Sequence, residues 1–158
     1  MKALVQRVKY ARVTVGGRET GSVGQGLLIL LGVMPDDDEK FADYLADRCA
    51  GLRIFEDEQG KMNRSLLDIG GAALVVSQFT LCADVSAGRR PSFSGAAHPA
   101  KADELYEYFK QALEKLGVRT ASGEFGADML VELGNDGPVT IMLETTLNSA
   151  GKPALKPN

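Results

Sequence analysis

Hydroxyl, amide and imidazole side chains are the groups of this sequence whose chemistry suits catalysis. The segment LVVSQFTL ends an apolar run with Ser77, Gln78, Phe79 and Thr80. A serine or threonine hydroxyl attacks an ester only when a nearby base activates it. The chain has one histidine, His98, which precedes Pro99, and no serine lies in a GxSxG elbow. We interpret His98 as a solvated residue before a helix, and keep a small-ester hydrolase using Ser77 and His98 as an alternative.

The segment NDGPVT at 135–140 contains the other candidate site residues, Gly137 and Pro138. Asn, Asp, Gly and Pro are the residues that turns use, and proline is tolerated where a strand begins. Alternation along SQFTL likewise fits a plain strand with side chains on both faces. Pattern alone therefore predicts ordinary strand and turn structure for both segments.

The sequence predicts neither a metal site nor a cofactor. Its two cysteines, Cys49 and Cys82, form no CxxC pair, and no HExxH or carboxylate-rich cluster occurs. Cys49 falls on the apolar side of a predicted helix with Phe41 and Leu45. We therefore expect Cys49 to be a buried, reduced thiol.

Strands outnumber helices in the pattern of apolar residues. Strands are predicted at 2–10, 12–15, 27–33, 52–55, 73–79, 129–133 and 139–143. One amphipathic helix is predicted to start near Asp36 to Asp38, and a second to follow Pro99 and end before Gly117. Because many strands have no helix between them, we expect an α+β fold, a largely antiparallel sheet or barrel with two main helices. We expect a single domain over residues 1–146 and a flexible tail over 147–158.

Composition narrows the class of protein. The chain has 158 residues, 44% of them hydrophobic and 25% charged, which fits one globular domain and excludes a disordered chain. A net charge of −3 argues against a general nucleic-acid coat protein, so any RNA contact is local. The start MKALVQRVKY lacks a signal peptide's apolar region, and the run Leu27 to Leu31 is too short for a membrane helix. We expect a soluble, cytoplasmic protein that binds neither membranes nor DNA.

Several separate motifs resemble one enzyme family. SQFTL at 77–81, GRRPSF at 88–93, FGADM at 125–129 and NDGPVT at 135–140 occur in the order found in the D-aminoacyl-tRNA deacylases. KALVQRV, GLLILLGV, LRIFED and GKMN are also similar to that family, and the resemblance covers about residues 1–145. One pentapeptide would be weak evidence, whereas the ordered set is highly specific.

The resemblance implies a hydrolase for chiral proofreading in translation. It would cleave the ester between a D-amino acid, or glycine, and the 3′-terminal adenosine of tRNA. The family resemblance implies a homodimer in which NDGPVT of one subunit faces SQFTL of the other, with a cis bond between Gly137 and Pro138. Two carbonyl oxygens at this corner would hold the substrate ammonium group, and an L side chain would strike its backbone.

The resemblance also implies roles for single residues. Backbone N–H groups around Phe79 and Thr80 would stabilise the oxyanion, with the Thr80 hydroxyl as a rival nucleophile that lacks an evident base. Phe125 and Met129 would form the pocket for the terminal adenosine, and Arg7 would brace the Gly-Pro loop. The residues assigned to phosphate contacts are Lys61, Arg64, Arg89 and Arg90.

Each of these roles has a plain alternative. Phe125 and Met129 also suit core packing, and the basic residues also suit a solvated surface. A non-catalytic tRNA-binding dimer is the main competing function. Cys82 and Ala87 depart from the family pattern, as does the tail, and put in doubt only pocket shape and RNA affinity.

Overall fold

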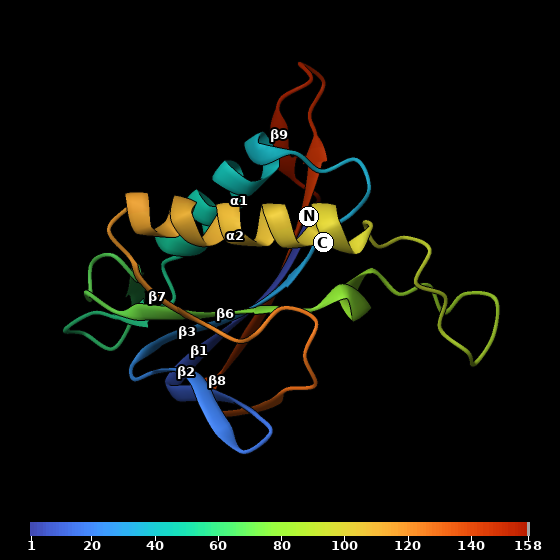
Figure 1. The fold of residues 1–158 in the computed structure, drawn as a ribbon. Helices are drawn as coiled ribbons and strands as arrows, with labels where there is room; N and C mark the ends of the chain where they lie inside the picture. Colours follow the sequence, from blue (N-terminus) through green and yellow to red (C-terminus); the bar gives the residue numbers. More distant parts are fainter. Residues whose placement is uncertain (158) are drawn as a thin grey trace.

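The structure, a computed structural model, describes residues 1–157 as two helices packed on one face of a curved sheet (Figure 1). The strands are β1 (Lys2–Val15), β2 (Arg18–Val23), β3 (Gly26–Gly32), β4 (Phe55–Glu56), β5 (Met62–Arg64), β6 (Ala72–Ser77), β7 (Arg119–Ser122), β8 (Leu130–Leu147) and β9 (Pro153–Leu155). The helices are α1 (Glu39–Gly51) and α2 (Pro99–Lys115), and a short 3-10 turn, η1 (Phe79–Cys82), follows β6. The predicted α+β fold with two main helices is confirmed.

Strand β1 lies at the centre of the sheet. Its first half pairs with β3, its second half pairs with β2, and β8 runs antiparallel along most of its length. The pairs β3–β6 and β6–β7 are instead parallel, so the sheet is mixed. Parallel pairs need long crossover connections, and α1 and α2 lie in those two connections. The antiparallel arrangement predicted from the sequence holds around β1 and β8, and the two helices account for the parallel part.

The sheet curls until β2 approaches β7. A Cβ atom on Gly21 of β2 would collide with the backbone carbonyl oxygen of Ser122 in β7, so only glycine fits this close approach. The curl gives the sheet two apolar faces. One faces the helices, where Ile29 packs in a core cluster with Leu45 of α1 and Phe109 of α2, and the other lies inside the curl.

Caps and one buried hydrogen bond fix the helices. Asp38 caps α1, accepting hydrogen bonds from the Lys40 and Phe41 N–H groups at 3.0 and 3.2 Å. The Tyr106 hydroxyl of α2 donates to the Val75 carbonyl at 2.9 Å, which ties the helix to β6. Burial raises the pKa of Tyr106 to about 12, so the hydroxyl keeps its proton well above neutral pH. Strand β6, which leads into SQFTL, is therefore tied to α2.

The last residues fold back on the sheet. Strand β9 pairs with Thr145–Leu147, and the Lys156 N–H donates to the Glu144 carbonyl at 2.7 Å. The flexibility expected for 147–158 and the domain boundary at 146 stay predictions. Among residues 1–157, no helix is long and apolar enough to cross a membrane.

Candidate active site

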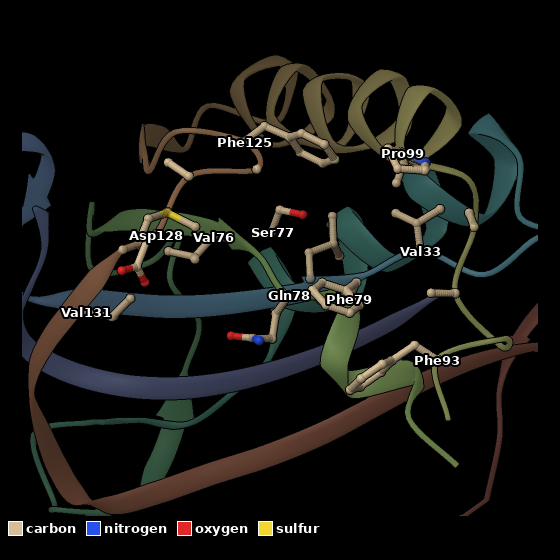
Figure 2. Close-up of a pocket in the computed structure, with 17 residues that line it drawn as sticks. Val33, Val76, Ser77, Gln78, Phe79, Phe93, Pro99, Phe125, Asp128 and Val131 are labelled. Carbon is tan, nitrogen blue, oxygen red and sulfur yellow. The ribbon is translucent and has the colours of Figure 1, made fainter. Parts of the chain in front are cut away.

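A cavity of about 570 Å³ opens where β6 ends, under the first turns of α2 (Figure 2). Ser77, Gln78 and Phe79 line one side, and residues 125–129, which include Phe125 and Met129, line the opposite side. The rest of the lining is mainly apolar and includes Val33 and Pro99. A cavity of this volume, apolar with a few polar groups, is typical of a small-molecule or cofactor site. Five of the predicted site residues thus meet at one place.

The wall made by SQFTL depends on a close approach to β3. The Gln78 N–H donates to the Leu31 carbonyl at 2.8 Å, which extends the β3–β6 pairing to the point where η1 begins. Gly32 lies directly beneath η1, where an added Cβ would be 3.1 Å from Leu81 Cβ and 3.2 Å from the Gln78 carbonyl oxygen. The absence of a side chain at Gly32 therefore sets the position of η1.

Turn η1 presents free backbone donors. The first N–H groups of any helical turn have no acceptor within the turn. In residues 1–157, no acceptor is found for the N–H of Phe79 or of Thr80. The Thr80 hydroxyl accepts from the Gln78 amide at 2.5 Å, and no basic side chain is bonded to it in that same part of the chain. The arrangement offers N–H donors for an anionic oxygen and no activated hydroxyl nucleophile.

Aromatic side chains frame the cavity. The ring centroid of Phe125 lies 6.0 Å from that of Tyr106 on α2, so Phe125 packs against the helix at the cavity wall. Phe79 and Phe93 pack edge to face with ring centroids 5.0 Å apart, and 54% of Phe79 is exposed (Figure 2). Phe93 belongs to the GRRPSF motif, but sequence reasoning did not assign it to the site. The sequence feature that could have identified Phe93 is an aromatic residue within a polar loop.

Gly137 and Pro138 lie in a bulge within strand β8, which we call the excursion. Asn135 pairs with Val8 and Thr140 pairs with Gln6, so residues 136–139 of β8 all lie opposite Arg7 alone. The Gly137–Pro138 bond is cis, and Gly137 has φ of +143°, a conformation that L residues rarely adopt. Both residues are exposed and neither lines the first cavity. One chain therefore does not bring Gly137 and Pro138 together with SQFTL.

The side chain of Arg7 is hydrogen-bonded to the first residue of this excursion. Arg7 as a whole residue is 6% exposed, and its Nε donates to the Asp136 carbonyl at 2.7 Å while Nη1 donates to the Ile54 carbonyl at 2.5 Å. A second cavity of about 420 Å³ lies beside it, lined by charged residues that include Arg7, Arg64 and Asp136. Arg7 thus contacts the Gly-Pro excursion and does not line the first cavity.

The remaining predicted residues lie outside the first cavity. Lys61 and Arg64 belong to the β4–β5 hairpin, and Arg89 and Arg90 lie in the long loop before α2; all four are exposed. His98 caps α2, with its Nδ1 accepting from the Ala100 N–H at 3.4 Å. No hydrogen bond joins His98 to Ser77 within residues 1–157, and that range holds no group of three or more metal-binding side chains.

The family profile described as D-Tyr-tRNA(Tyr) deacylase matches residues 4–144. The chain belongs to the D-Tyr-tRNA(Tyr) deacylase family. It is 56% identical to the D-aminoacyl-tRNA deacylase of Symbiobacterium thermophilum, over 92% of this chain and 96% of that protein. It is 60% identical to the D-aminoacyl-tRNA deacylase of Ruegeria pomeroyi, over 91% of this chain and 99% of that protein. The family resemblance predicted from the motifs is confirmed.

Two solved structures share this fold. One, named c-Myc DNA Unwinding Element Binding Protein, has a TM-score of 0.87 and 42% identity, covering 92% of this chain and 99% of its own. The other, described as a probable eukaryotic D-amino acid tRNA deacylase, has a TM-score of 0.77 and 18% identity, covering 89% and 97%. The second likeness shows the fold alone.

Proposed function

We propose that this protein hydrolyses the ester that joins a D-amino acid, or glycine, to the 3′-terminal adenosine of tRNA. The observation that carries the proposal is the division of the family's motifs into two separate parts. Residues 77–79 of SQFTL and the FGADM segment line a cavity, whereas Gly137 and Pro138 are exposed on the other side of β1. A site divided in this way needs a second copy of the chain to complete it.

In the proposed complex, the terminal adenosine occupies the cavity between η1 and Phe125. Phe125 and Met129 are half-buried on the wall opposite Ser77, where a base can stack on the aromatic ring and a ribose can reach η1. A volume of about 570 Å³ is in the range for a ligand of this size. Core packing alone does not explain why both side chains border an open cavity.

Backbone groups supply the proposed catalysis. Water attacks the carbonyl carbon of the ester, the carbonyl oxygen becomes an oxyanion, and the ribose oxygen leaves as a hydroxyl. The unpaired N–H groups of Phe79 and Thr80 stabilise the oxyanion, and the neighbouring ribose hydroxyl helps to activate the water. Because the donors are main-chain atoms, the backbone position of Ser77, Gln78 and Thr80 matters more for catalysis than their side chains do.

Handedness is read by the Gly137–Pro138 backbone of the partner subunit. Its carbonyl oxygens hold the substrate ammonium group, so a D side chain points away and an L side chain meets the turn. Glycine has no side chain to reject and is accepted. A Cβ on Gly137 would lie 2.8 Å from Val139 Cγ2 and 3.2 Å from Arg7 Nη2, so the turn itself has no room for a larger residue.

Surface cations complete the proposed RNA contacts. Lys61, Arg64, Arg89 and Arg90 are exposed on a chain of net charge −3, and they contact phosphates close to the acceptor end. The proposed location is the cytoplasm, where tRNA is charged and used. We do not propose DNA as a partner, although one structural relative is named for DNA binding.

The two other functions lack support from a specific contact. A serine hydrolase needs His98 beside Ser77, yet the His98 Nδ1 serves as a helix cap. A tRNA-binding dimer without catalysis would have no use for unpaired donors at the cavity wall.

A deacylation assay tests the proposal. Purified protein should release the amino acid from D-tyrosyl-tRNA and glycyl-tRNA and leave L-tyrosyl-tRNA intact. Binding of tRNA without release of any amino acid would leave the non-catalytic dimer as the better explanation. Loss of activity in His98→Ala, with the fold intact, would favour the serine hydrolase.

A further inference from the structure

We propose that Asn135 is a positioning residue that joins the two ends of the Gly137–Pro138 excursion by hydrogen bonds and thereby sets how strictly the enzyme rejects L substrates. This inference rests on the proposed function. Residues 136–139 leave the register with β1, so their backbone groups lack regular ladder partners on that strand. Something else must hold the two ends of the excursion together.

The Asn135 side chain makes that connection. Its Oδ1 accepts from the Val139 N–H at 2.7 Å, and its Nδ2 donates to the Val139 carbonyl at 3.2 Å. Nδ2 also donates to the Thr140 hydroxyl at 3.0 Å. One amide therefore bonds both backbone groups of Val139, which directly follows Pro138. The Asn135 side chain thus supplies hydrogen-bond partners in place of the β1 backbone groups that the excursion lacks.

The chemistry of this position favours asparagine. Only an amide side chain of this length offers an acceptor and two donors together. Aspartate keeps the acceptor for the Val139 N–H but loses the donors and places a negative charge beside the Val139 carbonyl. Alanine loses every bond. The two substitutions therefore remove the connection in part and in full.

Arg7 and Asn135 hold opposite ends of the same excursion. Arg7 bonds the Asp136 carbonyl at the start, and Asn135 bonds Val139 at the end, so Gly137 and Pro138 are fixed from both sides. If the end is released, the two carbonyl oxygens that receive the substrate ammonium group change direction. Chiral discrimination should therefore fall more than the rate of ester hydrolysis, which depends on the distant η1.

The test compares Asn135→Ala and Asn135→Asp with Glu132→Gln. Glu132 lies on the same strand and bonds Arg12 of β1 at 2.7 and 2.9 Å on the exposed face, so its loss disturbs the same strand pair away from the excursion. Kinetics would be measured with D-tyrosyl-tRNA and L-tyrosyl-tRNA, and exchange of the Val139 amide hydrogen would be followed by NMR.

Removing two or three hydrogen bonds should weaken the hold on the ammonium group by about ten-fold. We expect Asn135→Ala to raise KM for D-tyrosyl-tRNA about ten-fold with kcat changed less than three-fold. The ratio of D to L hydrolysis should fall at least ten-fold, and the Val139 amide should exchange faster. Asn135→Asp should lie between Asn135→Ala and the wild type, and Glu132→Gln should match the wild type in all three readouts.

Failure of this inference is distinct from failure of the proposed function. If the wild type does not discriminate between D and L substrates, the proposed function is wrong. If the wild type discriminates and Asn135→Ala keeps both its ratio and its KM while Val139 exchange accelerates, Asn135 holds the turn without serving recognition, and the inference is overturned. If Asn135→Ala does not fold, the KM, ratio and exchange of Asn135→Asp decide in the same way.

Discussion

Replacing Gly32 by alanine should slow the enzyme by moving η1 while leaving the protein folded. The new Cβ would lie 3.1 Å from Leu81 Cβ, 3.2 Å from Cys82 Sγ and 3.2 Å from the Gln78 carbonyl oxygen. Carbon atoms in contact prefer about 3.5–4.0 Å, so η1 must move outward by roughly 0.5 Å. Its outer face is exposed at Phe79 and Thr80, so the turn has room to move.

We expect Gly32→Ala to cost less in stability than in catalytic rate. Overpacking of this size costs about 1 kcal/mol, at the low end of the usual range, because the neighbour can move. For a chain of this size that is a fall of about 3 °C in Tm. Displacement of the proposed oxyanion donors should cost more, about ten-fold in the single-turnover rate constant, since a misplacement of about 1 Å can cost a hundred-fold.

The assay is single-turnover deacylation of D-tyrosyl-tRNA together with a thermal melt. Gly24→Ala is the matched control, because Gly24 lies in the bend just before the other end of β3 and an added Cβ there meets no atom within 4 Å. We expect Gly24→Ala to behave as the wild type. If Gly32→Ala keeps the wild-type single-turnover rate constant while its Tm falls, the position of η1 is not what controls the rate.

Three further predictions concern other parts of the molecule. Thr80→Ala should keep kcat within about three-fold, because the proposed oxyanion donor is its backbone N–H; near-total loss of turnover with an intact fold would identify the hydroxyl as the nucleophile. Changing both Arg89 and Arg90 to alanine should raise KM for tRNA and reduce the slope of log K against log salt by about 1.4, with kcat unchanged; an unchanged slope would place these side chains away from phosphate. Cys49 should resist alkylation in the native protein at pH 8.5, because burial raises its pKa to about 12; mass spectrometry should find it modified only after unfolding, and rapid native modification would contradict its burial.

Local patterns were enough to predict much of the fold. The apolar run in β3, the acidic residues before α1 and the proline at the start of α2 are signals that depend on near neighbours. Strands β2 and β7 were not predicted, since RETGSV and RTAS are short and largely polar. They form because the curled sheet brings them together, and Gly21 permits that approach. Such tertiary effects have no local signature.

The candidate site likewise has features that sequence motifs predict and features that depend on the tertiary structure. Co-occurring motifs were enough to name SQFTL and the Gly-Pro pair as candidate residues. Their separation within one chain, the packing of Gly32 under η1 and the bonds of Asn135 to Val139 depend on register and three-dimensional contacts. Asn135 itself was assigned to an ordinary turn, because asparagine is common in turns whatever else it does.

Mixed dimers test most directly whether two protomers build one site. One chain would carry Gly137→Ala, which damages the turn, and the other Ser77→Trp, which fills the cavity. Each variant alone should be inactive on D-tyrosyl-tRNA. A heterodimer should regain about one of two sites, since the intact cavity of one chain meets the intact turn of the other. If purified heterodimers stay as inactive as the separate variants, the turn serves its own chain's cavity and the shared site does not exist.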